Sequence, residues 1–197
     1  MKKKNLVVIL SICVCGVIAF SVLAVYLAKS QNNTAGSDSD PATNGAYIDE
    51  NGTLIVPEGS DYLPESCVGS WEVKADSHVL QSPRNTEMSE EDAIASEVES
   101  GLLLAYDSYR TNRISSVASP YYKVTQNCTT EALDAVGMQS DGIMDEFGDN
   151  ASITKIDVYE QDGTTLADTL FVINDQYLVY YGTGNFVFAA TKVEAVG

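Results

Sequence analysis

The stretch that decides the fold is ITKIDVYEQDGTTLADTLFVINDQYLVYYGTGNFVFAATKV, residues 153–193. Short runs rich in β-branched and aromatic residues alternate here with turn-forming residues, a pattern typical of strands joined by hairpins. The runs predict four strands, at Ile153–Glu160, Leu166–Asn174, Gln176–Gly182 and Asn185–Val193. The connections contain Asp162-Gly163, Asn174-Asp175 and Thr183-Gly184-Asn185, which favour tight turns. The last third of the chain is therefore expected to be an antiparallel meander.

The preceding residues add more strands and one or two short helices. Period-two apolar patterns predict strands at Gly69–Ala75, Leu102–Tyr109 and Tyr121–Gln126, with a hairpin turn at Thr111-Asn112-Arg113. Ser89 followed by Glu90, Glu91 and Asp92 predicts the start of a helix over 89–100, and a shorter helix is expected over 129–136. Seven or so strands with only two helices favour a closed antiparallel β-barrel, which leaves no exposed sheet edge.

Gly69-Ser70-Trp71, at the start of the first of these strands, resembles the Gly-x-Trp motif of lipocalins and the wider calycin group. The layout over about residues 67–194 is similar to that of small extracytoplasmic lipocalin-like proteins of Gram-positive bacteria. The resemblance implies that Trp71 plugs the closed end of the barrel and that a basic residue late in the last strand packs over it. Lys192 is the candidate for that residue, although lipocalins usually have arginine there. The Thr-Asp-Tyr motif of lipocalins is absent.

The N-terminal run Leu6–Ala28 contains 23 residues and no charge, and it lies between Lys2-Lys3-Lys4 and Lys29. A helix of that length spans about 35 Å, enough to cross a bilayer core of about 30 Å. Because lysines favour the cytoplasmic side, we predict a single-pass membrane protein with the C-terminal part outside the cytoplasm. Cleavage after Ser30, as in a signal peptide, remains the alternative, and the protein would then be secreted.

Composition and charge divide the rest of the chain. Residues 31–66 are rich in Asn, Ser, Gly, Asp and Pro, which predicts a flexible acidic stalk, and residues 67–197 have the size of one barrel domain. All 28 acidic residues but only seven of the 11 basic residues follow residue 30, so the outer part carries 21 net negative charges. Such a surface repels phosphate backbones, which argues against a nucleic acid partner.

We find no set of residues that would form a catalytic centre. His78 is the single histidine, it lies in a polar segment, and no glycine-rich phosphate loop is present. Asp141, Asp145 and Asp149 are spaced by four, but Gly142 and Gly148 argue against a helix, so we expect a solvated acidic loop, with a calcium site as the alternative. The sequence therefore predicts no enzymatic activity, no cofactor and no metal.

Cys67 and Cys128 are the two cysteines that follow the N-terminal run. An even pair outside the cytoplasm is consistent with a disulfide, which would close a loop of about 60 residues. A free pair of thiols remains the alternative, since not every bacterium has oxidising machinery outside the cytoplasm.

Tyrosine is unusually frequent in the predicted barrel, and this bears on function. A barrel of about eight strands either fills itself with side chains or holds one small ligand. If it is hollow, aromatic residues are expected to point inward around the ligand: Tyr106, Tyr121, Tyr177, Tyr181, Phe186 and Phe188. We expect an anchored lipocalin-like domain that binds a small, partly apolar molecule. The alternative is a filled barrel that serves as a structural or protein–protein interaction module of the cell envelope.

Overall fold

The computed structural model describes residues 45–193. The predicted membrane anchor at Leu6–Ala28 and the first part of the predicted stalk lie outside the described residues. Within the described part, every helix is too short or too polar to cross a membrane.

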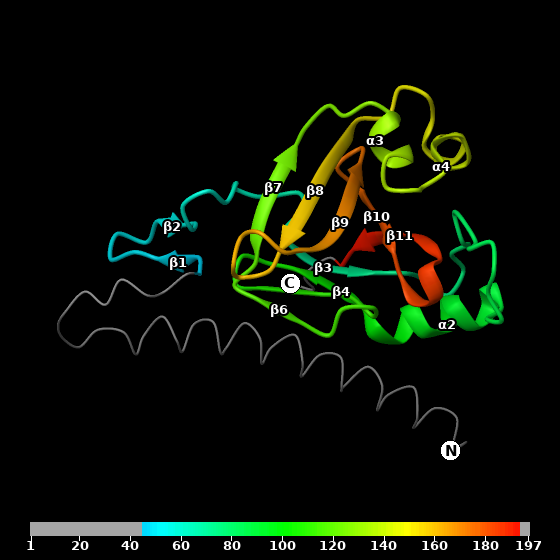
Figure 1. Cartoon of the computed structure of the whole chain (residues 1–197), viewed down its shortest axis with the longest axis horizontal. Coiled ribbons are helices and arrows are strands. Elements are labelled where there is room, and N and C mark those ends of the chain that lie inside the picture. Colours follow the sequence, from blue (N-terminus) through cyan, green and yellow to red (C-terminus); the bar gives the residue numbers. More distant parts are fainter. Residues whose placement is uncertain (1–44, 194–197) are drawn as a thin grey trace, which may run out of the picture. The chain divides into compact units, whose positions relative to one another are not determined.

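The described residues are mainly β-strands, with three short α-helices and one 3-10 turn (Figure 1). The strands are β1 (Tyr47–Ile48), β2 (Leu54–Ile55), β3 (Gly69–Glu72), β4 (Leu102–Leu104), β5 (Ser108–Arg110), β6 (Val117–Ala118), β7 (Tyr121–Thr125), β8 (Ile153–Tyr159), β9 (Leu166–Ile173), β10 (Tyr177–Tyr181) and β11 (Val187–Lys192). The helices are α2 (Glu90–Ser100), α3 (Glu131–Asp134) and α4 (Ser140–Phe147), and the 3-10 turn η1 covers Thr183–Asn185. The four strands predicted for residues 153–193 are confirmed, each within one or two residues at its ends.

Nine strands form one antiparallel sheet in the order β6-β5-β4-β3-β11-β10-β9-β8-β7. β1 and β2 pair only with each other. Strand β3 pairs with β11, with Lys192 opposite Trp71, so the first strand of the sheet joins the C-terminal meander. This pairing places both residues of the lipocalin resemblance on neighbouring strands.

The sheet curls into a half-barrel, and its end strands β6 and β7 do not pair with each other (Figure 1). The sequence predicts a closed barrel, and this prediction is wrong, because the sheet stays open between β6 and β7. The reason lies in the connection between the two end strands. It consists of Ser119, with a positive φ of 49°, and Pro120, which has no N–H to donate, and β6 itself is only two residues long.

Residues that we assigned to the stalk cover the open edge of β7. The Asp61 amide donates to the Tyr122 carbonyl at 2.8 Å, and the Val124 amide donates to the Asp61 carboxylate at 2.9 Å. The Ser60 hydroxyl accepts from the Tyr122 amide at 3.0 Å. Leu63, a little further along, is 4% exposed. The residues from Ser60 onward are therefore part of the folded domain, because they satisfy the backbone groups of an edge strand and add to the core.

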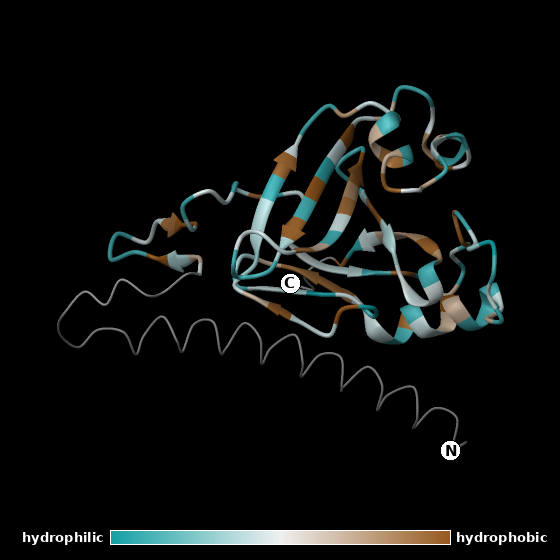
Figure 2. Ribbon diagram, in the orientation of Figure 1, coloured by the Kyte–Doolittle hydropathy of each residue, from teal (hydrophilic) through white to brown (hydrophobic). Residues whose placement is uncertain are grey.

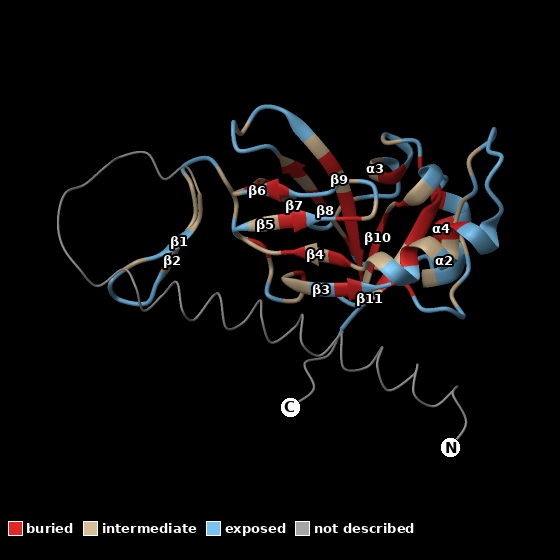
Figure 3. Cartoon of the chain, turned by 90° about the horizontal axis from the view of Figure 1, so that it is seen from below, coloured by how far each residue is buried: buried red, intermediate tan, exposed pale blue. Residues whose placement is uncertain are grey.

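Two apolar clusters form, one on each face of the sheet, because adjacent residues of a strand point to opposite faces. The larger one lies inside the half-barrel and contains Trp71, Tyr109, Tyr122, Tyr180 and Phe188, among others. The second lies on the outer face, where residues of β9, β10 and β11 pack against α3 and α4. Figures 2 and 3 show that the sheet strands carry most of the apolar and buried residues, whereas the loops are largely exposed.

Helix α2 begins as predicted. The Ser89 hydroxyl accepts from the Asp92 amide at 3.1 Å, and three acidic residues occupy the first turn. Helix α3 confirms the shorter predicted helix. Helix α4 contradicts our expectation of a loop around Gly142. Ile143 and Met144 pack into the outer cluster, and this burial outweighs the low helix propensity of glycine; the helix ends at Gly148, with φ of 89°.

We expect opposite effects from the same substitution at two glycines. A Cβ on Gly182 would lie 2.6 Å from a carboxylate oxygen of Glu97 and 2.8 Å from the Phe188 ring, so Gly182→Ala should lower the free energy of unfolding by about 1–3 kcal/mol. Gly142, in α4, has nothing within 4 Å of such a Cβ, so Gly142→Ala should raise it by about 0.5–1 kcal/mol. Urea unfolding of the two variants tests this, and equal effects would contradict the packing around Gly182.

Candidate functional site

Three buried tyrosines hold the inside of the half-barrel together: Tyr109 on β5, Tyr122 on β7 and Tyr180 on β10. Each hydroxyl donates to an acceptor on a different element of the fold. Tyr109 donates to the Asp168 carboxylate at 2.7 Å, Tyr122 to the Ala105 carbonyl at 2.5 Å, and Tyr180 to the Glu97 carboxylate at 2.7 Å. Burial is the main cause that raises the pKa of each of these three tyrosines, which keeps the hydroxyls protonated as donors.

Asp168 is a charged residue inside the barrel and is only 5% exposed. Besides Tyr109, the partly exposed Arg113 donates to it at 2.6 Å, and the Thr169 amide donates to it at 2.9 Å. Burial raises the pKa of the Asp168 carboxyl, and the bonds from Tyr109 and Arg113 partly offset this. Asp168 thereby links β9 to β5 and to the β5–β6 turn.

Glu97 is the second buried carboxylate, 2% exposed, on the inner side of α2. It accepts from the Tyr180 hydroxyl at 2.7 Å, from the Thr183 amide at 2.6 Å and from the Asn112 side-chain amide at 3.2 Å. These bonds tie α2 to β10, to η1 and to the β5–β6 turn. A buried carboxylate is costly unless such donors surround it, so Glu97 acts as an organising acceptor of this end of the barrel.

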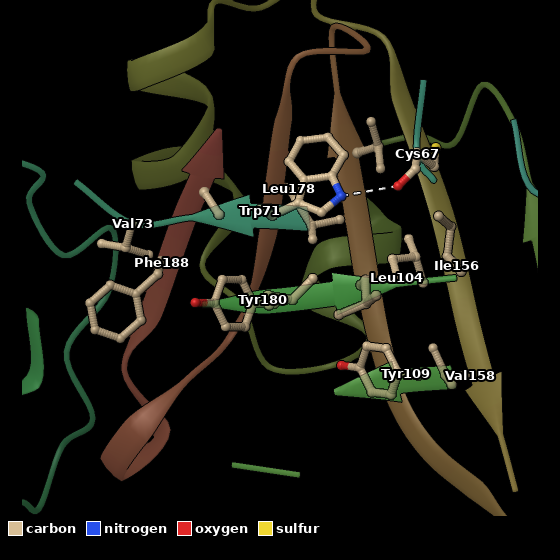
Figure 4. Packing of buried hydrophobic residues seen from close by; sticks show 14 of the residues in the cluster. Cys67, Trp71, Val73, Leu104, Tyr109, Ile156, Val158, Leu178, Tyr180 and Phe188 are labelled. Atoms are coloured by element: carbon tan, nitrogen blue, oxygen red, sulfur yellow. Dashed lines mark hydrogen bonds between the residues drawn. The ribbon is translucent and has the colours of Figure 1, made fainter. Parts of the chain in front are cut away.

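Buried apolar and aromatic side chains from several strands occupy the space between these groups, and Figure 4 shows Trp71, Tyr180 and Phe188 among them. Trp71 is 1% exposed and Phe188 is fully buried, with the Tyr180 and Phe188 ring centroids 6.3 Å apart. Of the two pockets described below, one lies away from this cluster, and the other borders its margin at Leu63, Val68 and Tyr106. The three inward tyrosine hydroxyls each donate to a group of the domain itself, so none of them has a free donor for a guest molecule.

The structure separates the six residues that we expected around a ligand. Phe186 and Phe188 lie in the inner cluster, and Tyr106 packs at its margin with its hydroxyl bonded to the Leu63 carbonyl. Tyr177 and Tyr181 pack on the outer cluster, where Tyr177 contacts Phe147 and Tyr181 donates to the Val136 carbonyl. Tyr121 is half-buried and lies against Gly163 in the β8–β9 turn. These six side chains therefore do not line one common space.

The structure places the motif residues on neighbouring strands, with Lys192 opposite Trp71. The Trp71 indole is buried and donates to the Cys67 carbonyl at 3.0 Å. The Lys192 side chain crosses Gly69, where a Cβ would lie 3.0 Å from its Cε, and its ammonium group donates to the Glu65 and Ser66 carbonyls. Lys192 thus ties the segment before β3 to the end of β11, next to Trp71.

The predicted Cys67–Cys128 disulfide is absent, because both thiols are free. Cys67 is fully buried in the inner cluster, whereas Cys128 packs on the outer cluster, so the sheet lies between them. Burial raises the pKa of the Cys67 thiol. The even number of cysteines after the N-terminal run was therefore not a sign of pairing.

The acidic residues around α4 line a pocket of about 310 Å³ formed by Thr130, Asp141, Met144, Asp145 and Asp149. Helix α4 brings Asp141 and Asp145 to one side, but no group of acidic, cysteine or histidine residues in the described part of the chain has the arrangement of a metal site. His78 is exposed and lies 3.4 Å from Glu146. These residues form a solvated acidic surface.

A larger groove is formed mainly by the segment that precedes β3, at the margin of the inner cluster. Its volume is about 690 Å³, and it is lined by Thr53, Leu54, Tyr62, Leu63, Glu65, Val68 and Tyr106. We call these seven residues the tyrosine groove. The rings of Tyr62 and Tyr106 meet edge to face, with centroids 6.5 Å apart, and Tyr62 is 57% exposed. Together the groove and the buried network form the candidate functional region.

Sequence reasoning named Tyr106 but missed the rest of the groove and both buried carboxylates. Two signals would have found the carboxylates. Asp168 lies on the same face of β9 as the apolar Leu170 and Val172, because residues two apart in a strand share a face. Glu97 follows Ala93 by four residues and therefore lies on the buried side of α2. Most residues of the groove come from a segment whose composition resembles a linker. That segment has no periodic apolar pattern, so the sequence does not indicate the groove.

No family model matches this chain, and neither curated proteins nor solved structures give a significant match.

We expect the buried carboxyl of Asp168 to give stability a distinct pH dependence. Because its folded pKa is raised above the ordinary value of 3.8, its contribution is fully present below that pH and is lost as the pH rises through the folded pKa. Asp168→Asn removes this titration. The free energy of unfolding of the wild type, minus that of the variant, should therefore fall as the pH rises above 3.8 and level off once the pH exceeds the folded pKa. Urea unfolding at several pH values measures it, and a difference that rises with pH would contradict the assignment.

Proposed function

We propose that this protein is an anchored, extracytoplasmic, lipocalin-like module that binds a protein partner through its outer surface. The observation that carries the proposal is the filled interior of the half-barrel. A binding pocket for a small molecule typically has about 300–1,000 Å³ and a few directed polar groups. Inside this barrel the aromatic rings pack together, and the polar groups are bonded to one another. The outer surface remains for recognition.

The N-terminal run supports the location. Leu6–Ala28 has the length and composition of a membrane span, and the lysines before it favour an orientation with the folded domain outside the cytoplasm. In this proposal the partner is another component of the cell envelope or of the space around it.

The second candidate function is the binding of a small, partly apolar molecule, and the tyrosine groove is the observation that favours it. Its volume falls within the range of small-molecule pockets, and apolar side chains from Leu54, Leu63 and Val68 contribute to it. The groove is open to solvent, however, whereas pockets for small ligands usually enclose most of the ligand surface. A groove of this kind suits a side chain or a short segment of another protein.

The proposal assigns no reaction, cofactor or nucleic acid to the domain. The single histidine is exposed and faces Glu146, and the two buried carboxylates are bonded to structural groups. The absence of enzymatic activity stays a prediction.

Photo-crosslinking in living cells tests the proposed function. A photoreactive amino acid is placed in the full-length protein at one of three exposed positions: Tyr47, Tyr62 or Leu166. We expect at least one of these positions to give a discrete adduct with one protein, whose mass is identified by proteomics. Adducts with small molecules or lipids alone, at all three positions, would contradict the proposal.

A further inference from the structure

We propose that the tyrosine groove binds a basic segment of the partner protein, in which lysine or arginine side chains alternate with apolar ones. This inference rests on the proposed function and names the partner's chemistry and the place where it binds. It follows from three features of the groove: its hydrogen-bonding capacity, its charge and its apolar floor.

The polar groups of the groove mainly accept hydrogen bonds. The Tyr62 hydroxyl donates its proton to the Leu54 carbonyl at 3.1 Å, and the Tyr106 hydroxyl donates to the Leu63 carbonyl at 3.0 Å. Each hydroxyl therefore already uses its single donor in a bond within the domain, and its oxygen can still accept a hydrogen bond. Glu65 is exposed and adds a carboxylate. A partner that supplies donors, such as an ammonium or guanidinium group, complements this lining.

The charge of the surrounding chain favours a cation. There is no lysine or arginine between Lys29 and Lys74, while the segment that supplies most of the groove contains five acids: Asp49, Glu50, Glu58, Asp61 and Glu65. Two ammonium groups from elsewhere in the chain contact this segment. Lys192 donates to the Glu65 and Ser66 carbonyls, and Lys123 donates to the Gly59 carbonyl, so both are occupied by the backbone. Five carboxylates outweigh these two ammonium groups by three charges (5 − 2 = 3), so the potential over this segment is negative and steers positive groups toward it.

The rest of the lining is aromatic and aliphatic. Tyr62 and Tyr106 meet at 69°, and the exposed Tyr62 ring offers a face to a cation next to the carboxylate of Glu65. Leu54, Leu63 and Val68 provide apolar surface for the stem of a lysine or arginine and for a neighbouring apolar side chain. Aromatic rings beside acidic groups around an apolar floor are suited to a segment that carries both kinds of side chain.

Fluorescence anisotropy with a labelled probe peptide tests this inference. The probe is a capped hexapeptide of alternating lysine and phenylalanine, and the control probe has glutamate in place of lysine. The receptor is the full-length protein in nanodiscs of a zwitterionic lipid, with empty nanodiscs as the blank. We expect saturable binding of the basic probe that weakens as salt is raised, and no binding of the acidic probe.

Matched variants locate the binding. Glu65→Gln should weaken binding of the basic probe about two- to fivefold, and Tyr62→Ala should weaken it by a similar factor. Tyr62→Phe keeps the ring but removes the acceptor oxygen, so it should weaken binding less than Tyr62→Ala does. Glu99→Gln removes one charge from the exposed side of α2, away from the groove, and should have little effect.

Two results would overturn the inference. One is binding of the acidic probe as tight as that of the basic probe. The other is an equal effect of Glu65→Gln and Glu99→Gln, since the attraction would then be spread over the whole acidic surface. Failure of this inference is distinguishable from failure of the proposed function. If the peptide does not bind but crosslinking at Leu166 gives a protein adduct, the domain binds a protein partner at a place other than the tyrosine groove.

Discussion

Trp71→Ala is expected to lower the free energy of unfolding by about 3–5 kcal/mol, which is the usual cost of truncating a large buried aromatic residue. Trp71 is 1% exposed in the inner cluster, and its indole N–H holds the Cys67 carbonyl at 3.0 Å. The substitution therefore opens a cavity and also releases the segment that closes this end of the barrel. Urea unfolding followed by circular dichroism measures the effect, because the variant lacks the only tryptophan and its fluorescence signal.

Trp71→Phe separates the two contributions. It keeps an aromatic ring in the core but removes the indole donor, so it should cost clearly less than Trp71→Ala. Lys192→Met removes the ammonium group that binds the Glu65 and Ser66 carbonyls and keeps the long side chain over Gly69. A loss below about 1 kcal/mol for Trp71→Ala would mean that Trp71 is not a core residue.

Glu97→Ala is expected to cost about 3 kcal/mol, although it removes an acidic side chain from a strongly acidic protein. The carboxylate accepts from the Tyr180 hydroxyl, from the Thr183 amide and from the Asn112 side chain. Without it, a buried hydroxyl and a partly buried amide lose their acceptor, and each unsatisfied buried group costs about 1–3 kcal/mol. Urea unfolding of the full-length variant in mild detergent gives the change in stability.

Glu99→Ala is the matched control, because it is the same substitution on the same helix at an exposed position. A change within about 0.5 kcal/mol is expected there, as for most surface substitutions. If Glu97→Ala and Glu99→Ala had the same effect, the carboxylate of Glu97 would not organise the end of the barrel.

The meander and the helix start at Ser89 were predictable because their signals are local. Alternating apolar residues and turn-forming pairs mark β8 to β11, and the serine with three following acids marks α2. The burial of Trp71 followed from a three-residue motif. Each of these predictions depends only on residues that are close together in sequence. Strand periodicity and helix capping are determined by such neighbours.

The contents of the barrel were not predictable in the same way. Tyr109 meets Asp168 and Tyr180 meets Glu97 across separations of 59 and 83 residues. Which tyrosines face inward depends on the exact strand register, and a shift of one residue moves a side chain to the other face. We selected Tyr177 and Tyr181, which lie outside, and did not select Tyr180, which lies between them in sequence and points inside.

Long-range packing also explains the other differences. Residues 60–67 join the folded domain because they cover the open edge of β7, and the sequence does not indicate that this edge is open. Helix α4 forms because Ile143 and Met144 pack on the outer face of the sheet. The separation of Cys67 from Cys128 by the sheet is equally a consequence of topology. In each case a tertiary contact outweighs a local preference.

The central claim is that side chains fill the half-barrel, so that recognition occurs on its surface. Native mass spectrometry of the full-length protein, extracted from its own cells and released from detergent micelles, tests this claim most directly. We predict the mass of the bare chain, or of the chain with an intact protein partner. A reproducible small added mass that is lost on denaturation and that persists in the groove variant Tyr62→Ala would contradict the claim, because the ligand would then lie inside the half-barrel.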